Sequence, residues 1–275
     1  MKRKKNIKSI GIFDSGFGGL NIMRGIVKEL PGYNYVYLGD TARVPYGTRS
    51  KEVIYDFTKQ AVDFLFSKDC EMIVLACNTA SSDALRRIQQ EYLSIHYPNK
   101  KVLGVIIPAA EFAVAKTKNK KIGVMATESA VSSKSFIKEL LKVNGDVKVY
   151  QNSCPLLVPI VEAGEHNSKI TDIVLRKYLK PLVDSKIDTL ILGCTHYGIL
   201  ESKIKRIVGK NISVISEEKI VAKRLKDYLS RHKEIERILA KRGKREFYST
   251  DLTKKFDVLG SKFFGKKIQA KKAII

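Results

Sequence analysis

Two segments of the chain combine a buried-strand pattern with a cysteine at the strand's end. Residues 72–79 read Met-Ile-Val-Leu-Ala-Cys-Asn-Thr, and residues 190–196 read Leu-Ile-Leu-Gly-Cys-Thr-His. A continuous apolar run of this length is typical of a parallel strand that is covered on both faces. Ligands of open α/β sheets bind at the carboxyl ends of such strands. The pattern therefore places Cys77 and Cys194 where chemistry is expected.

A cysteine at a strand end has a structural interpretation as well, because free cysteine often behaves as a small buried hydrophobe. The repetition of the pattern, with polar neighbours both times, favours a functional role for Cys77 and Cys194. Cys70 precedes its predicted strand and Cys154 stands before Pro155 in a turn-like stretch, so we interpret both as structural. Two thiols presented by two similar units suggest one substrate that is approached from two sides.

Predicted strands and helices alternate along the chain, which favours right-handed βαβ units and parallel sheets, an α/β fold. A strand at 7–13 leads through three glycines into a helix that ends near Leu30, and the pattern restarts after a polar stretch at 92–101. A second break lies near 209–211. We expect residues 1–98 plus 209–275 to form a first α/β domain, which holds Asp14 and Cys77, and 99–208 a second, which holds Cys194 and His196.

Composition excludes several classes of protein. The four cysteines among 275 residues are too few and too irregularly spaced for a disulfide framework. The basic N-terminal segment is followed by no long apolar run, so we expect no signal peptide, no membrane span and a cytoplasmic protein. The net charge of +23 allows nucleic-acid binding, but the basic residues are spread over the chain without a recognisable motif. We therefore expect no dedicated nucleic-acid role.

Three clusters of residues could carry chemistry. The glycine-rich turn at 11–20 contains Asp14 and Ser15 and could offer backbone N–H groups to an anion, although either side chain could also cap a helix. The loop at 38–47 carries Pro45 and Gly47 as turn signals, and loops on rigid scaffolds often bind ligands. Polar groups next to the two cysteines form the third cluster: Asn78, Thr79, Thr195 and His196. A histidine beside a thiol can exchange protons with it.

The four ordered motifs of these clusters resemble those of glutamate racemases. They are Asp14-Ser15-Gly16, the loop from Gly39 to Gly47, the segment from Ala76 to Ser81 and the segment from Gly193 to Tyr197. The segments from Leu157 to Glu162 and from Gly123 to Thr127 are similar to two further blocks of that family. The resemblance runs from about residue 8 to the tail near 264. Thr195-His196 after the second cysteine favours glutamate over aspartate racemases, which resemble Cys-Thr-Glu there.

The resemblance implies two similar α/β domains that face each other across an active-site cleft, with no metal and no pyridoxal phosphate. It implies that Cys77 acts on D-glutamate with help from Asp14. It likewise implies that Cys194 acts on L-glutamate with help from His196 and Glu162. The substrate-binding residues that it implies are Asp14, Ser15, Tyr46, Gly47, Asn78, Thr79, Thr127, Thr195 and His196. We further expect a homodimer that supplies D-glutamate for peptidoglycan.

Other interpretations remain open at this point. A related racemase could act on aspartate or another small amino acid, and a basic nucleic-acid- or gyrase-binding protein could carry a silenced site. A redox dithiol would need Cα atoms of the two cysteines within about 7 Å of each other. The chain also departs from the resemblance: Ser216-Glu217 stands where the family tends to have Asp-Ser or Asp-Pro, and Ala109 where it often has Gly.

Overall fold

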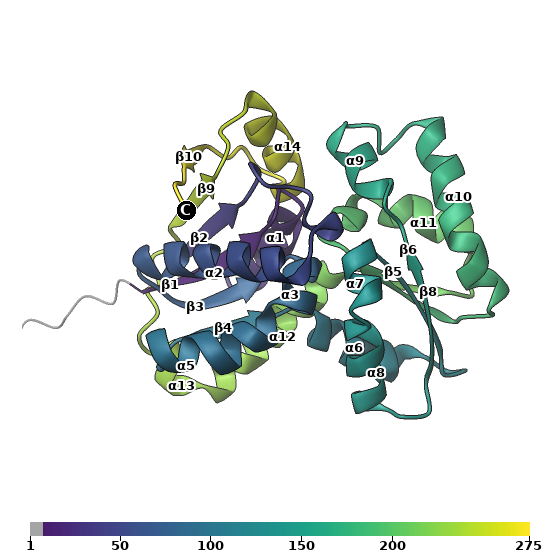
Figure 1. Cartoon of the computed structure of the whole chain (residues 1–275), viewed down its shortest axis with the longest axis horizontal. Helices are drawn as coiled ribbons and strands as arrows, with labels where there is room; N and C mark the ends of the chain where they lie inside the picture. The colour runs from purple at the N-terminus through teal and green to yellow at the C-terminus, as the bar shows by residue number, and fades with distance from the viewer. Residues whose placement is uncertain (1–7) are drawn as a thin grey trace, which may run out of the picture.

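The computed structural model describes residues 8–275, and they form two lobes that are each built on one parallel sheet (Figure 1). The six-stranded sheet of the first lobe has the order β10-β9-β2-β1-β3-β4, and the four-stranded sheet of the second lobe has the order β6-β5-β7-β8. Every strand pair in both sheets is parallel. The predicted fold class, an α/β protein with two parallel sheets, is confirmed.

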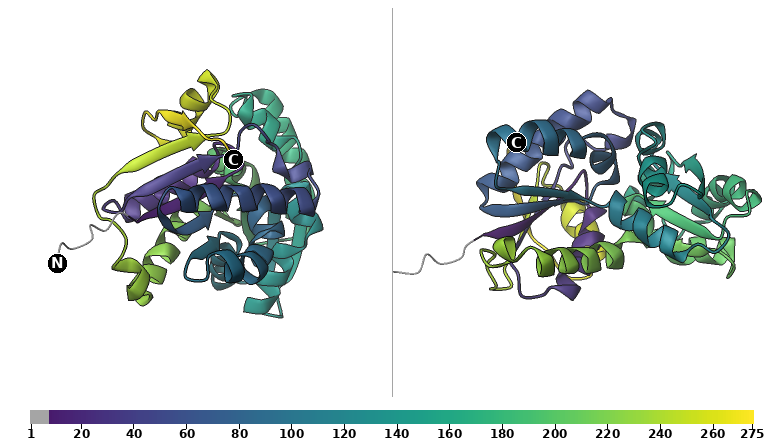
Figure 2. Two further views of the ribbon diagram at one scale, coloured as in Figure 1. Left: turned by 60° about the vertical axis from the view of Figure 1, so that its left-hand side comes forward. Right: turned by 90° about the horizontal axis from the view of Figure 1, so that it is seen from below.

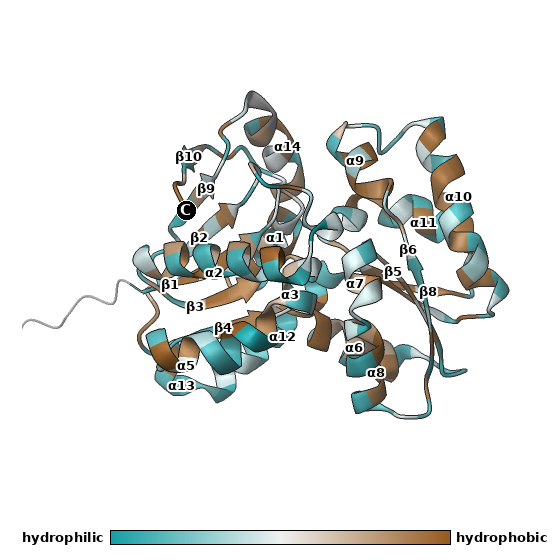
Figure 3. Cartoon of the chain, viewed as in Figure 1, coloured by the Kyte–Doolittle hydropathy of each residue, from teal (hydrophilic) through white to brown (hydrophobic). Residues whose placement is uncertain are grey.

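The central strands follow apolar runs of the sequence, whereas β6, β9 and β10 are mostly polar. In the first lobe the strands are β1 (Ser9–Asp14), β2 (Tyr35–Gly39), β3 (Cys70–Leu75), β4 (Lys101–Gly104), β9 (Arg245–Ser249) and β10 (Ala270–Lys272). In the second lobe they are β5 (Lys121–Ala126), β6 (Lys148–Ser153), β7 (Thr189–Gly193) and β8 (Ser213–Ile215). The central strands β1 and β7 are buried at every residue, and Figure 3 shows apolar colour along β3. Burial on both faces explains why these segments lack the alternation of an exposed sheet.

Helices cover both faces of each sheet (Figure 2). In the first lobe, α1 (Gly19–Glu29), α12 (Glu217–Arg231) and α14 (Lys254–Phe264) pack together on one face, and α2 (Lys51–Ser67) packs on the other. In the second lobe, α6 (Ile106–Lys116) and α8 (Ser135–Val143) pack together, and α10 (Lys169–Asp184) contacts β5 and β6. The shorter helices are η1 (Tyr46–Thr48), α3 (Asn78–Asp83), α4 (Leu85–Arg87), η2 (Ile88–Tyr92), α5 (Leu93–His96), α7 (Glu128–Ser132), α9 (Leu157–Glu162), η3 (Thr195–Leu200), α11 (Glu201–Val208) and α13 (Lys233–Glu236).

The places where the chain passes between the sheets differ from the predicted boundaries at 98/99 and 208/209. Strand β4, predicted to belong to the second domain, pairs with β3 in the first sheet. Strand β8, predicted to belong to the first domain, pairs with β7 in the second sheet. The polar stretch around Pro98 is a turn before β4, and Gly209 ends α11 at a φ of 78°. These breaks in composition mark turns within a lobe, and the crossings follow one strand later.

Two smaller differences concern strand ends. Cys70 is the first residue of β3 and is fully buried, although the sequence places it before the strand. The apolar run at 102–107 extends past the end of its strand, because β4 ends at Gly104 and α6 begins at Ile106. Residues 1–7, which include the basic N-terminal segment and the first residue of the predicted strand at 7–13, lie outside the described residues. Within residues 8–275, none of the helices has the length and apolar character that a membrane crossing requires.

Candidate active site

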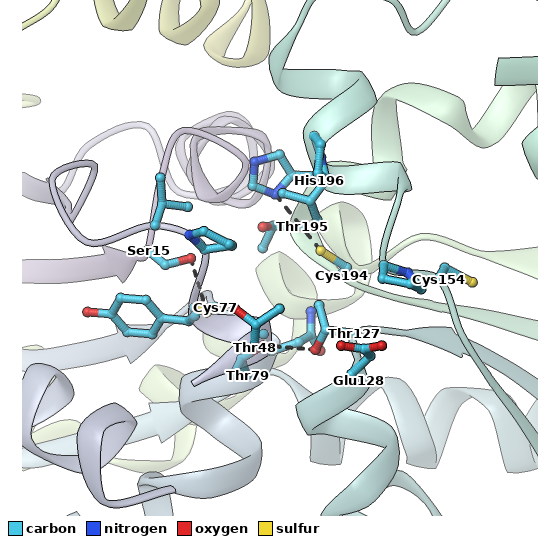
Figure 4. A pocket seen from close by; sticks show the side chains of 18 residues that line it. Ser15, Thr48, Cys77, Thr79, Thr127, Glu128, Cys154, Cys194, Thr195 and His196 are labelled. Carbon is cyan, nitrogen blue, oxygen red and sulfur yellow. Dashed lines mark hydrogen bonds between the residues drawn. The ribbon is translucent and has the colours of Figure 1, made fainter. Parts of the chain in front are cut away.

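A cavity of about 110 Å³ lies between the two lobes, next to the ends of β3 and β7 (Figure 4). Cys77 follows β3 directly after Ala76, and Cys194 follows β7, so each lobe contributes one thiol to the cavity. Its lining residues are Ser15, Val44, Pro45, Tyr46, Gly47, Thr48, Cys77, Asn78, Thr79, Thr127, Glu128, Cys154, Pro155, Val158, Pro159, Cys194, Thr195 and His196. The two strand-end cysteines therefore meet at one site, as the repeated pattern predicts.

Cys77 is held in the first lobe between β3 and α3. Its side chain is 5% exposed, and its Sγ donates a hydrogen bond to Oγ of Ser15 at 3.5 Å. Burial and, to a lesser degree, the nearby charge of Asp14 raise the pKa of the Cys77 thiol to about 11. The free site thus favours the thiol form of Cys77, and a bound cationic group would favour the thiolate.

Cys194 begins a chain of contacts in the second lobe. Its Sγ lies 3.9 Å from Nδ1 of His196, and Nε2 of His196 lies 3.2 Å from Oε1 of Glu162. Burial lowers the pKa of His196, but Cys194 and Glu162 outweigh it and raise that pKa to about 10. Burial raises the pKa of the Cys194 thiol, and His196 opposes this increase. Since the thiol and the imidazole are coupled, they titrate as a pair, with an imidazolium that stabilises the Cys194 thiolate.

Asp14 connects the two lobes behind the cavity. Its Oδ1 accepts a hydrogen bond from Oγ1 of Thr195 at 3.2 Å, and its Oδ2 accepts one from the backbone N–H of Gly16 at 3.1 Å. The side chain is fully buried, and burial raises the pKa of Asp14, although the positive charge of His196 lowers it in part. A carboxyl group from the first lobe is thereby tied to the residue that follows the second thiol.

The glycines of the first turn permit the lobes to approach each other closely. A Cβ on Gly18 would lie 2.5 Å from Oγ1 of Thr195 and 2.8 Å from Nδ1 of His196. On the opposite rim, a Cβ on Gly47 would lie 2.8 Å from Cβ of Thr127. At Gly18 the glycine-rich turn therefore lies against protein groups of the second lobe. Thr79 and Thr127 add a hydrogen bond of 3.0 Å between the lobes at the cavity wall.

Ten of the predicted site residues line the cavity: Ser15, Tyr46, Gly47, Cys77, Asn78, Thr79, Thr127, Cys194, Thr195 and His196. Asp14 and Glu162 lie behind the cavity, and they contact the lining residues Thr195 and His196 respectively.

The loop at 38–47 is held together by bonds to Asp40. The phenol of Tyr46 donates to Asp40, and Arg43 pairs with the same carboxylate at 2.6 Å. Asp40, Arg43 and Tyr46 all belong to the loop at 38–47, so these two bonds fix the shape of the loop, and they leave Arg43 paired inside the protein.

Sequence reasoning missed several cavity residues. Cys154, interpreted as structural, lines the cavity, and burial raises the pKa of its thiol to about 12. Thr48 and Glu128 also line the cavity. Each directly follows a predicted site residue, Gly47 and Thr127 respectively, and this adjacency was the sequence feature that could have identified them. Glu217, noted only as a departure from a resemblance, is a buried carboxyl that accepts a hydrogen bond from Asn78. No sequence pattern distinguishes a buried Glu217 from an ordinary acidic residue at a helix start.

The donor groups of the site suit acid–base chemistry better than metal binding. Among the described residues, no three His, Cys, Asp or Glu side chains lie together in a way that could hold a metal ion. All four cysteines are free thiols. Two thiols, one imidazole and two carboxyl groups can together remove and return protons at one bound molecule.

The family model for Asp/Glu/Hydantoin racemase matches residues 10–225, which include both cysteines. The chain belongs to this racemase family. It is 41% identical to a glutamate racemase of Persephonella marina over 264 residues, which cover 96% of each chain. It is 38% identical to a glutamate racemase of Geobacter metallireducens, with coverage of 95% of this chain and 94% of the relative.

Solved structures of the racemase family agree with this assignment. A glutamate racemase isoform, RacE1, from Bacillus anthracis superposes with a TM-score of 0.90 at 33% identity and covers 98% of both chains. A glutamate racemase from Francisella tularensis, in complex with D-glutamate, gives 0.87 at 32% identity with the same coverage. An aspartate racemase from Picrophilus torridus gives 0.54 at 19% identity, with 81% of this chain and 94% of that chain covered, which shows the fold alone. The predicted resemblance to glutamate racemases is confirmed.

Proposed function

We propose that the protein interconverts L- and D-glutamate by proton transfer at the α-carbon, with Cys77 and Cys194 as the two catalytic groups. The observation that carries this proposal is the delivery of one thiol from each lobe to the same cavity. Inversion of a tetrahedral carbon requires removal of the proton on one face and its replacement on the other. A single catalytic group on one side would have to move around the substrate, whereas two opposed thiols need not.

The proton balance of the proposed reaction is simple. With D-glutamate, the Cys77 thiolate takes the α-proton and becomes a thiol, and the Cys194 thiol donates its proton to the opposite face and becomes a thiolate. With L-glutamate the two cysteines exchange roles. The imidazolium of His196, held by Glu162, stabilises the Cys194 thiolate, and its pKa of about 10 keeps it charged at neutral pH. Asp14, beside Cys77 and bonded to Thr195, is proposed to assist on the other side.

The cavity walls offer the polar groups that an amino acid with two carboxylates needs. Hydroxyl groups of Ser15, Thr79 and Thr127 and the amide of Asn78 line the cavity. Such neutral donors and acceptors can bind carboxylate and ammonium groups without competing for the α-proton. We propose these residues, with Asp14, Tyr46, Gly47, Thr195 and His196, as the substrate-binding set.

Three further proposals concern the protein's setting. We propose that it acts in the cytoplasm and supplies D-glutamate for peptidoglycan.

We also propose that the protein is a homodimer. The adjacent helices α6 and α8 carry exposed apolar residues that a second copy could cover. They are Ile107, Phe112, Leu141 and Val143, which are 47%, 46%, 41% and 44% exposed. Light scattering on the wild type and on Phe112→Glu tests this. A monomeric wild type would refute the homodimer.

Circular dichroism of the purified protein with D-glutamate, without added cofactor, tests the proposed reaction. The signal of the wild type decays toward zero as the isomers equilibrate, and the decay is strongly slowed in Cys77→Ser and in Cys194→Ser. Cys70→Ser, a change at a buried thiol outside the cavity, is the matched control and keeps most of the activity. A circular dichroism signal that stays constant for the wild type with both isomers of glutamate would refute the proposed reaction. Decay with aspartate instead would favour the related racemase.

A further inference from the structure

One buried carboxyl beside the cavity has no part in the proton transfers proposed above. Glu217 is the first residue of α12 and is 3% exposed. Its Oε2 accepts a hydrogen bond from Nδ2 of Asn78 at 2.8 Å, and Asn78, 2% exposed, lines the cavity directly after Cys77. The remaining oxygen of each side chain, Oε1 of Glu217 and Oδ1 of Asn78, is buried and has no hydrogen-bond partner.

This arrangement is unfavourable for folding. A buried carboxyl with one hydrogen bond has lost most of its hydration, and an unpartnered buried oxygen carries the full cost of that loss. Burial and, to a lesser degree, the charge of Asp14 raise the pKa of Glu217 to about 8. The next residue, Glu218, is instead stabilised by a cation, because it forms an ion pair with Arg24 at 2.7 Å. Groups that weaken the fold in this way concentrate at functional sites.

The hydrogen bond from Asn78 to Glu217 determines which end of the Asn78 amide is free. An amide has a donor end and an acceptor end, and the ionised form of Glu217, which predominates above its pKa of about 8, can only accept. Glu217 therefore holds Nδ2, the donor end of Asn78, on its own side and leaves the acceptor Oδ1 without a protein partner. Glutamate offers two carboxylates, which are acceptors, and one ammonium group, which is a donor. The free Oδ1 matches the ammonium group.

We propose that Glu217 is a positioning residue that fixes the Asn78 amide with its carbonyl oxygen toward the ammonium group of the bound amino acid. The inference rests on the proposed racemase function and adds to it a residue that contributes to substrate binding without touching the substrate. Glu217 acts only through Asn78, so its effect on catalysis depends on the presence of that amide. It acts on binding more than on proton transfer, because the thiols are unchanged.

Steady-state kinetics of a small set of variants test this inference at a pH of about 8.5, where most of Glu217 is ionised. Glu217→Met keeps a similar volume and removes the acceptor, and we expect it to raise KM about tenfold, the loss of one hydrogen bond with a charged group, while kcat changes less than about threefold. Glu217→Gln retains a carbonyl that can accept from Nδ2 of Asn78 and restores KM to within about threefold of the wild type. Glu218→Gln, one residue along, is the matched control and leaves KM unchanged.

A double-mutant cycle separates positioning from a general effect on the fold. In an Asn78→Ala background, Glu217→Met has little further effect on kcat/KM, because the residue through which it acts is gone. An unchanged KM in Glu217→Met, or an equally large effect with and without Asn78, overturns the inference and leaves the racemase function intact. A wild type that is inactive with both isomers of glutamate refutes the proposed function and the inference with it.

Discussion

Replacement of Glu162 by glutamine removes the carboxylate that holds the imidazolium of His196. The two side chains are 19% and 3% exposed and lie 3.2 Å apart, so solvent screens their interaction little. A hydrogen bond between charged groups contributes roughly 1.5–3 kcal/mol, and each pKa unit corresponds to about 1.36 kcal/mol. The variant should therefore lower the pKa of His196 from about 10 to about 8 or 9.

The lower pKa of His196 reduces the activity of the variant at high pH. The imidazolium deprotonates as pH rises through its pKa, so the variant loses the charge that stabilises the Cys194 thiolate at a lower pH than the wild type. We expect the alkaline limb of the kcat/KM profile to move down by one to two pH units, about as far as the pKa. Because enantiomers have equal free energies, kcat/KM must fall equally for L- and D-glutamate, which provides an internal check on the kinetics.

Nuclear magnetic resonance of the histidine side chains measures this pKa directly. The chain has four histidines, so each ring signal can be assigned by single replacements. The exposed His96 provides a reference signal in the same spectra. A His196 signal that titrates near its ordinary value of about 6.5 in both proteins would refute the reasoning, because Glu162 would then have no measurable hold on the imidazolium.

Three further predictions concern single replacements. Glu217→Gln increases stability most at high pH: burial raises the pKa of Glu217 from 4.5 to about 8, so this residue's contribution to stability is lost as pH rises through 8, and urea unfolding at pH values of about 5 and 9 should show a growing advantage of the variant. An equal advantage at both pH values would contradict this. Gly18→Ala places a Cβ 2.5 Å from Oγ1 of Thr195 and should cost about 1–3 kcal/mol in unfolding experiments, with a large loss of kcat, whereas an unchanged kcat would show that the lobes need not meet there. Thr195→Val leaves Asp14 without that hydroxyl donor and should lower kcat/KM about tenfold or more, and normal kinetics would exclude a role for the bond between the lobes.

Much of this architecture could be predicted from the sequence, because the strongest signals are local. The continuous apolar runs before Cys77 and Cys194 predict buried parallel strands, and parallel strands bring their carboxyl ends to one edge of a sheet. Polar residues that follow such strands therefore reach the cavity together. The six-stranded and four-stranded sheets bear out this reasoning.

The remaining features depend on contacts between distant segments. Strand pairing decides that β4 joins the first sheet and β8 the second, and breaks in composition at Pro98 and Gly209 mark only turns. Cys154 lines the cavity because β6 ends beside β5, which its own neighbours do not reveal. The burial of Glu217 depends on the packing of α12 against α1, a contact between residues about 200 positions apart.

The origin of the hydrogen in the product tests the central claim, that two thiols on opposite faces share the proton transfer. The wild type is incubated with protiated D-glutamate in D₂O, and both isomers are analysed by mass spectrometry at low conversion. The two-thiol account predicts deuterium at the α-carbon of the L-glutamate that forms, while the remaining D-glutamate stays protiated. Deuterium that enters the remaining D-glutamate as fast as it enters the product, or L-glutamate that retains the original hydrogen, would contradict it.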